Sequence, residues 1–181
     1  MKLKTIFTYY AFALLTSYNL SAQTLQDGLK KYEHLLGTFE VEVMMPTRDG
    51  GWTKGGEGKA TFETILGGKF IQEKIKTTFG QGTLTMHNTI GIDPRESAFR
   101  LFAMDREYGS MDMYKGRAEG NDLIFDNLDS DKRFQSPTGE SLAFRLNFVY
   151  ISATEHHLLV EYTKDDGTTW YPYAKNIYKK I

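Results

Sequence analysis

Apolar and polar residues alternate along much of the chain from Thr38 onward. Over residues 38–45, the apolar residues Phe39, Val41 and Val43 alternate with two glutamates. Because successive side chains of a strand point to opposite faces, this pattern predicts a strand with one buried face. Residues 141–151 show the same alternation most clearly, with an apolar residue at nearly every second position.

Ten such strand-like runs follow one another, most of them separated by turns of glycine, asparagine, aspartate or proline. They span residues 38–45, 57–65, 70–78, 83–92, 97–104, 110–118, 123–126, 141–151, 157–163 and 170–178. The connections between them are too short for a crossover helix, so neighbouring strands must run antiparallel. The pattern therefore predicts an all-β, antiparallel up-and-down barrel of about eight to ten strands.

Two further segments differ from the strands. Apolar residues at helical spacing over residues 25–36 predict a short N-terminal helix that plugs one end of the barrel. Residues 129–140 form a longer polar loop that contains Ser-Pro-Thr-Gly.

The first residues have the three parts of a secretory signal peptide. Lys2 and Lys4 precede an apolar run over residues 6–15, and small and polar residues then lead to Ala22. The apolar run is shorter than the roughly 20 residues that a membrane-spanning helix needs. We expect cleavage after Ala22, no integral membrane segment thereafter, and export to the periplasm or the exterior of a bacterial cell. Residues 23–181 are then expected to form one domain.

Composition narrows the class of partner. Without the leader, 20 basic and 23 acidic residues remain, a net charge of −3 with no basic cluster. This balance argues against a nucleic-acid-binding role. The chain has no cysteine, which excludes disulfides, thiolate metal ligands and a lipid-anchored cysteine.

Strand alternation also identifies residues expected to face the barrel interior. The apolar candidates are Phe39, Val41, Phe62, Met86, Leu101, Met113, Phe125, Phe144, Leu146 and Phe148. Three polar residues, His87, Arg100 and Arg145, are candidates for polar groups in the lumen. The two arginines would anchor an acidic ligand if they faced inward, and they would lie in solvent if they faced outward.

No motif for catalysis, metal binding or a cofactor stands out. The chain lacks a G-x-S-x-G nucleophile motif, a phosphate loop and a helical histidine pair at i, i+4 spacing. We therefore predict no catalytic residues, no metal and no cofactor. One alternative is a haem-binding barrel in which His156 or His157 supplies an axial nitrogen.

Residues 163–170, Thr-Lys-Asp-Asp-Gly-Thr-Thr-Trp, match an Asp-box hairpin. A propeller would repeat such a motif in every blade, so this single copy is interpreted as a structural turn. Asp165 is expected to accept backbone hydrogen bonds there, and Gly167 to adopt a positive φ.

Four segments carry a family resemblance. They are residues 35–41 (LLGTFEV), 62–73 (FETILGGKFIQE), 90–93 (IGID) and 166–170 (DGTTW), followed by a basic C-terminal strand. In this order they resemble secreted bacterial lipocalin-like proteins catalogued as domain of unknown function 1579. The resemblance implies a calycin-type barrel over about residues 35–180 and no particular chemistry. Phe39 occupies the place of the tryptophan that lipocalins prefer, and Lys179 or Lys180 is expected to cover its ring.

The leading functional hypothesis is a secreted or periplasmic protein that binds a small hydrophobic molecule in the barrel lumen. The alternatives are an enzyme that uses the cavity, the haem-binding barrel, and a structural module with a filled core. The sequence leaves the ligand and the oligomeric state open.

Overall fold

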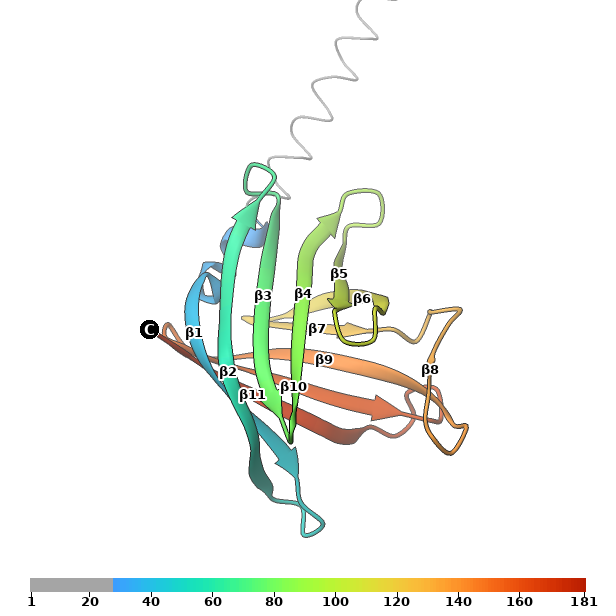
Figure 1. Cartoon of the computed structure of the whole chain (residues 1–181). Coiled ribbons are helices and arrows are strands. Elements are labelled where there is room, and N and C mark those ends of the chain that lie inside the picture. Colours follow the sequence, from blue (N-terminus) through green and yellow to red (C-terminus); the bar gives the residue numbers. More distant parts are fainter. Residues whose placement is uncertain (1–27) are drawn as a thin grey trace, which may run out of the picture.

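The computed structural model describes residues 28–181, which form a barrel with short connections (Figure 1). In chain order the strands are β1 (Gly37–Pro46), β2 (Trp52–Ile65), β3 (Phe70–Phe79), β4 (Gly82–Asp93), β5 (Ala98–Asp105), β6 (Met111–Glu119), β7 (Asp122–Asp126), β8 (Phe134–Gln135), β9 (Ser141–Ser152), β10 (Glu155–Thr163) and β11 (Tyr171–Lys180). Helical structure in the described part is limited to residues 28–30 and the 3-10 turn η1 (Glu33–Leu35). The predicted leader, residues 1–22, lies outside the described residues.

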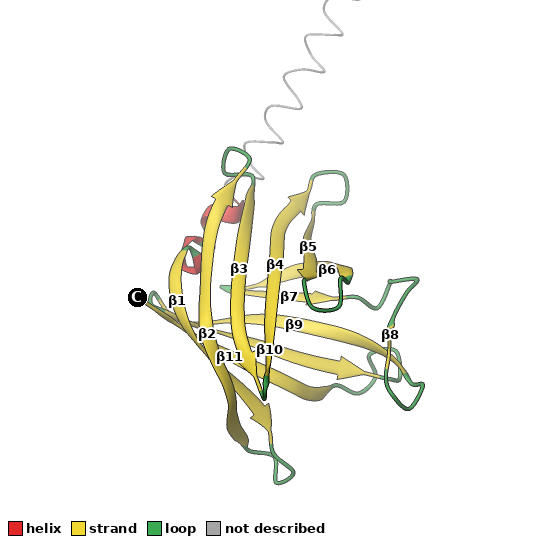
Figure 2. Ribbon diagram, viewed as in Figure 1, coloured by secondary structure: helices red, strands yellow, loops and turns green. Residues whose placement is uncertain are grey.

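Ten of the strands close into an antiparallel barrel. Each pairs with the next along the chain, except that β7 pairs with β9, and β1 pairs with β11 to close the ring. The two-residue strand β8 lies outside the ring and pairs only with the start of β9 (Figure 2). The predicted all-β up-and-down barrel with a short N-terminal helical segment is thus confirmed.

Strand β2 begins at Trp52, earlier than the expected Glu57, and so takes in the glycine-rich stretch 55–58. Two of these glycines permit a close approach to β3. A Cβ atom on Gly58 would lie 2.1 Å from the carbonyl oxygen of Lys76, and one on Gly56 would lie 1.9 Å from that of Thr78. The glycines therefore have a packing role, because any side chain would collide with the neighbouring backbone.

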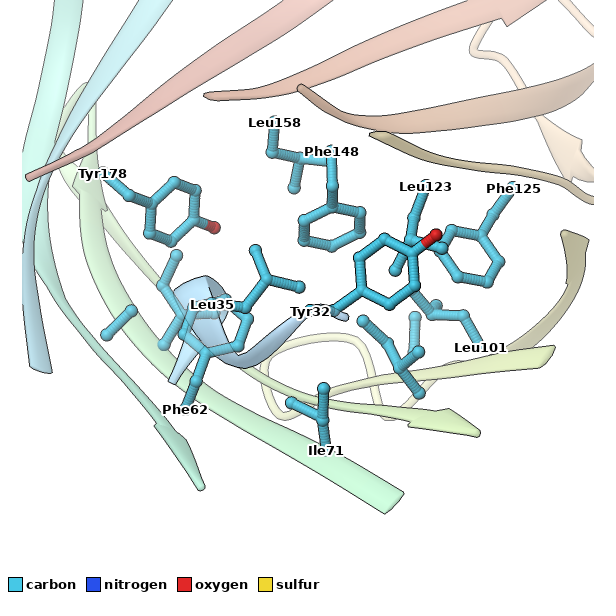
Figure 3. Packing of buried hydrophobic residues seen from close by; sticks show 14 of the residues in the cluster. Tyr32, Leu35, Phe62, Ile71, Leu101, Leu123, Phe125, Phe148, Leu158 and Tyr178 are labelled. Atoms are coloured by element: carbon cyan, nitrogen blue, oxygen red, sulfur yellow. The ribbon is translucent and has the colours of Figure 1, made fainter. Parts of the chain in front are cut away.

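One end of the barrel is closed by the N-terminal segment. Leu29, Tyr32 and Leu35 are buried inside this end, and Tyr32 meets Phe99 edge to face at 5.7 Å. Buried aromatic residues from the strands belong to the same core cluster. Figure 3 shows Phe62, Phe125, Phe148 and Tyr178, and Phe39 also belongs to the cluster. The predicted plug is therefore present in the described residues, and this half of the barrel has a packed core.

The expected cover over Phe39 is also present. Lys180 Nζ lies 5.9 Å from the centre of the Phe39 ring, at the closed end. Lys180 thus takes the position that the resemblance to lipocalins indicated for a basic residue. Within residues 28–181, no helix has the length and apolar character to cross a membrane.

Candidate functional site

The opposite half of the barrel contains a cavity of about 350 Å³. It lies toward the end where β3 meets β4, where β5 meets β6 and where β10 meets β11. Most of its wall is apolar, and its aliphatic lining residues are Val43, Ile75, Leu84, Met86, Ala103, Leu146, Leu158, Val160 and Ala174. These residues lie on the inward faces of their strands. Ile75 on β3 and Met86 on β4, for example, are paired directly opposite each other.

Aromatic side chains surround the mouth of this cavity. Phe79, Tyr108, Phe134 and Tyr173 line it and are exposed to solvent. Phe144 lies between two of them, with ring centres 6.1 Å from Phe134 and 5.6 Å from Tyr173. An exposed aromatic rim around an apolar cavity is typical of an entrance to a binding site rather than of a protein interior.

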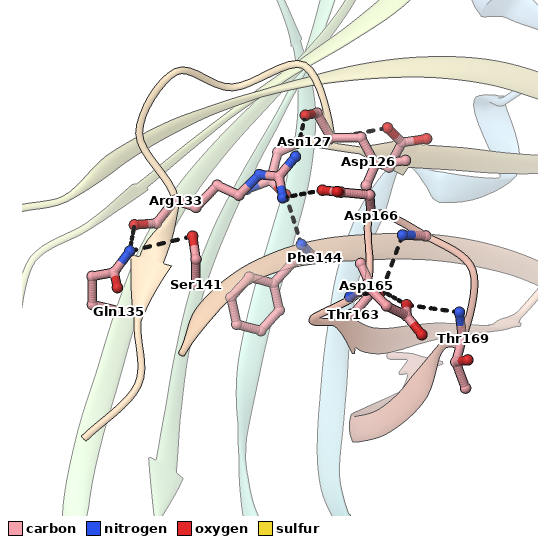
Figure 4. A network of polar contacts seen from close by, with 12 residues as sticks. Asp126, Asn127, Arg133, Gln135, Ser141, Phe144, Thr163, Asp165, Asp166 and Thr169 are labelled. Carbon is pink, nitrogen blue, oxygen red and sulfur yellow. Dashed lines mark hydrogen bonds and ion pairs between the residues drawn. The ribbon is translucent and has the colours of Figure 1, made fainter. Parts of the chain in front are cut away.

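The connection that carries Phe134 is held by long-range polar contacts (Figure 4). Arg133 donates to Asp166 Oδ1 at 2.6 Å and to the carbonyl oxygen of Leu128 at 2.8 Å. Asn127 Oδ1 accepts a hydrogen bond from the backbone of Phe144 at 2.6 Å. These contacts tie the polar loop to β9 and to the hairpin between β10 and β11, and they fix Phe134 at the mouth.

The hairpin between β10 and β11 has the predicted Asp-box geometry. Asp165 Oδ1 accepts from the backbone of Thr169 at 2.8 Å and from the hydroxyl of Thr163 at 2.6 Å. Gly167 adopts a φ of 85°, as its place in the turn requires. The arrangement is a compact structural turn beside the cavity mouth.

A polar group forms the floor of the cavity. The carboxyl group of Glu73 accepts hydrogen bonds from Asn88 Nδ2 at 2.6 Å and from the hydroxyl of Tyr178 at 2.7 Å. Glu73 is only 1% exposed, and burial raises the pKa of its carboxyl group above the ordinary value. Asn88 and Tyr178 line the cavity, so this buried network links the packed core to the lumen.

Asp112 and Tyr114 on β6 add polar groups to one wall of the cavity. Asp112 lies opposite Ala103 on β5. Burial, and to a smaller extent the nearby charge of Asp105, raises the pKa of the Asp112 carboxyl group. Burial also raises the pKa of the Tyr114 hydroxyl group. Tyr114 therefore stays neutral, and it offers the lumen a hydroxyl group rather than a charge.

The structure divides the ten apolar candidates into three groups. Met86, Phe144 and Leu146 line the cavity. Six others are buried in the packed core, namely Phe39, Val41, Phe62, Leu101, Phe125 and Phe148. Met113 was placed wrongly, because it lies on the outer face and is 54% exposed. Asp112 and Tyr114 take the inward positions of β6, and the apolar residues on both faces of this strand concealed its orientation.

The three polar candidates lie on the outer face and not in the lumen, which for the two arginines is the solvent-facing alternative. His87 is exposed. Arg100 pairs with Glu96 at 2.7 Å, and Arg145 pairs with Glu161 at 2.7 Å and lies over the Trp170 ring at 4.4 Å. Successive side chains of a strand point to opposite faces. Each of these three residues points outward because its neighbours on the same strand point into the barrel. Neither arginine is therefore placed to anchor an acidic ligand in the lumen.

The two histidines considered for haem lie at the closed end. His156 is 1% exposed and stacks on Tyr178, with ring centres 4.4 Å apart and planes at 14°. His157 Nε2 lies 2.9 Å from Glu155 Oε1. Neither histidine lines the cavity, so the geometry gives no support to an axial haem ligand from this pair. Residues 28–181 contain no cluster of three or more side chains suited to a metal ion.

Sequence reasoning missed the polar residues of the lumen, chiefly Glu73, Asn88, Asp112 and Tyr178. A usable signal was present for Glu73, because it stands between Ile71 and Ile75 on the inward face of β3. A carboxyl group at an alternating apolar position indicates a buried polar group with specific partners.

The fold and site define a ten-stranded up-and-down barrel that is closed at one end and hollow at the other. Residues 30–180 match the model of a family described as protein of unknown function, DUF1579, and the chain belongs to that family. None of the curated proteins matches the chain.

Solved structures of redesigned β-barrels have a low similarity to this chain. A redesigned β-barrel, mFAP1, bound to DFHBI is 13% identical, covers 83% of this chain and 98% of its own, and has a TM-score of 0.40. A second, mFAP0 bound to DFHBI, is 11% identical over 81% of this chain and 99% of its own, also with a TM-score of 0.40. Similarity at this level carries no information about what the present chain binds.

Proposed function

We propose that this protein binds a small, mostly apolar molecule in the cavity of the open half of its barrel. The observation that carries the proposal is a cavity of about 350 Å³ with a largely apolar wall. Binding sites for small molecules commonly measure about 300–1,000 Å³ and combine apolar walls with a few polar groups. The size favours a ligand of no more than about three aromatic rings, or a short branched chain.

The wall is suited to recognition by shape. Met86 is flexible and polarizable, and aromatic residues such as Phe144 and Tyr173 provide large flat surfaces. The polar floor at Asn88 and Tyr178 adds the small number of directional groups that orient a bound molecule.

The binding test uses a neutral dye whose fluorescence rises in apolar surroundings, N-phenyl-1-naphthylamine. We expect saturable binding of about one dye per chain. Ala103→Trp fills the cavity from β5, and Leu84→Trp obstructs it near the mouth, so each should weaken binding about tenfold or more. The matched control is Met104→Trp, because Met104 neighbours Ala103 but lies on the exposed outer face.

Circular dichroism would establish that each variant is folded. A wild-type protein that shows no saturable binding would leave the module with a filled core as the better interpretation. Equal affinity in wild type, Ala103→Trp and Leu84→Trp would show that the dye binds elsewhere and would contradict the proposal.

We further propose that residues 1–22 are a cleaved signal peptide and that residues 23–181 act as one exported domain, in the periplasm or outside the cell. The order of charged, apolar and small residues before Gln23 supports this proposal. N-terminal sequencing of protein from the envelope fraction should begin at Gln23. Protein that is found in the cytoplasm and still begins at Met1 would contradict export.

A further inference from the structure

The cavity wall has one formally charged side chain among its described lining residues, and that charge is negative. Asp112 projects from the inward face of β6, while no lysine, arginine or histidine of residues 28–181 lines the cavity. The carboxyl group of Glu73 is hydrogen-bonded to the lining residues Asn88 and Tyr178. An acidic ligand would therefore meet like charge and no compensating cation.

Asp112 has no internal partner. Within residues 28–181 its carboxyl group makes no hydrogen bond and no ion pair, and the neighbouring charge of Asp105 is of the same sign. Partial burial and this like charge both raise the pKa of its carboxyl group. A cationic group placed beside Asp112 would offset both effects, because an opposite charge favours the ionised carboxylate.

Asn88 supplies a second and independent observation. Its side chain is 5% exposed, and Nδ2 donates to Glu73 Oε2 at 2.6 Å, which orients the amide. The other amide atom, Oδ1, is buried and has no hydrogen-bond partner among the described residues. An amide oxygen accepts hydrogen bonds, so a ligand that carries an N–H or O–H group can donate to it. A carboxylate has no such donor.

We propose that the cavity selects small apolar molecules that carry a cationic amine over carboxylic acids of the same shape. The ammonium group binds beside Asp112 and donates to the free Oδ1 of Asn88, while the hydrocarbon part fills the apolar wall of Met86, Leu146 and Val160. This inference rests on the proposed binding function and specifies its ligand class.

The test compares three ligands that share one aromatic body, using isothermal titration calorimetry at pH 7.5 and low salt. They are 1-naphthylmethylamine, which is cationic, 1-naphthalenemethanol, which is neutral, and 1-naphthylacetic acid, which is anionic. We expect wild-type protein to bind the amine about tenfold or more tightly than the alcohol, and the acid weakest of the three.

Asp112→Asn removes the charge with little change of shape, so it should abolish the preference for the amine while the alcohol binds about as before. Asp131→Asn makes the same change of charge on the exposed loop before β8 and should leave the preference intact. The comparison of ligands on wild-type protein remains a complete test if Asp112→Asn fails to fold.

The outcomes distinguish a preference for amines from small-molecule binding as such. Acid that binds as tightly as amine would overturn the inference and leave small-molecule binding standing. Amine preference that persists in folded Asp112→Asn would also overturn it, since another group would then be responsible. Failure of all three ligands to bind saturably would count against the proposed function itself.

Discussion

His156 is an ionisable residue enclosed by aromatic rings. Its ring lies 4.9 Å from that of Phe39 and 5.4 Å from that of Phe62, and it stacks on Tyr178. Neither of its ring nitrogens has a hydrogen-bond partner in the part of the chain that the structure describes. Burial, with smaller contributions from nearby basic groups, lowers its pKa from 6.5 to about 3. His156 is therefore neutral in the folded protein at all but strongly acidic pH.

This residue makes stability depend on pH in a definite direction. The unfolded chain gains a proton at His156 as pH falls below 6.5, whereas the folded chain does not until about pH 3. Stability is therefore lost as pH falls through that window, by at most about 1.4 kcal/mol per pH unit. Glu73 acts in the opposite direction, because its raised pKa costs stability as pH rises above 4.5.

We predict that His156→Phe removes the contribution of His156 to acid sensitivity. Between pH 7 and pH 5 the wild type should lose about 2 kcal/mol more stability than this variant, as measured by urea unfolding at both pH values. His87→Phe, on the exposed outer face, is the matched control and should retain the wild-type difference. An identical pH dependence in wild type and His156→Phe would show that His156 is already protonated or solvated in the folded protein.

Single residues also show where sequence reasoning was sufficient and where it was not. Met86, Phe144 and Leu146 were placed correctly in the lumen wall because clear alternation fixes the face of a strand. Met113 was placed wrongly because β6 carries apolar residues on both faces, so its pattern is compatible with either orientation. The orientation of β6 is set by its register with β5, in which Leu101 lies opposite Tyr114. This register cannot be read from the sequence of β6 alone.

At the scale of elements, β2 and β3 pack at a distance that only glycine allows. The positions concerned are Gly56 and Gly58, whose missing side chains make room for the β3 backbone. The sequence showed a glycine-rich stretch, but it did not show that the stretch belonged to the strand. The close approach follows from pairing with β3, since Gly58 lies opposite Thr77.

We predict that Gly58→Ala destabilises the protein by about 2–3 kcal/mol, because the new methyl group would meet rigid backbone rather than a mobile side chain. Chemical denaturation would measure the change. Gly82→Ala is the matched control, since its Cβ would lie 3.5 Å from its nearest neighbour, the carbonyl oxygen of Phe79. Its stability should stay within about 1 kcal/mol of wild type. Equal effects of the two substitutions would contradict a packing role specific to Gly58.

The barrel strands were recognisable because each pairs with a sequence neighbour through a short turn, so local patterns suffice. Strand β8 was missed because it has two residues and depends on distant contacts, among them the ion pair between Arg133 and Asp166 at 2.6 Å. The turn at residues 163–170 was foreseen because the bonds to Asp165 are local. Elements fixed by nearby residues were thus predictable, and those fixed by tertiary contacts were not.

At the scale of the whole molecule, the barrel is filled at one end and hollow at the other. The same strand alternation produces both halves, so it could not show which lumen-facing residues would be packed and which would line a cavity. The difference depends on the N-terminal segment, which fills the closed end with Leu29, Tyr32 and Leu35. The cavity begins where this plug and its aromatic partners end, at the level of Tyr178 and Asn88.

If this division is correct, the two ends should respond differently to loss of an aromatic side chain. Tyr32 is 1% exposed within the plug, whereas Tyr108 is 86% exposed at the cavity mouth. We predict that Tyr32→Ala costs about 3 kcal/mol or more in urea unfolding, because it leaves a void in a packed core. Tyr108→Ala should change stability by less than about 0.5 kcal/mol.

Dye binding should show the reverse order. Tyr32 does not line the cavity, so folded Tyr32→Ala should bind N-phenyl-1-naphthylamine with nearly wild-type affinity. Tyr108 does line it, and Tyr108→Ala should weaken binding several-fold by removing part of the aromatic rim. Tyr32→Ala should then lower mainly stability and Tyr108→Ala mainly dye binding. The two variants together would show that one end of the barrel stabilises the fold and the other end binds the dye. A Tyr32→Ala variant that is as stable as wild type would mean that the N-terminal segment does not close the barrel in solution.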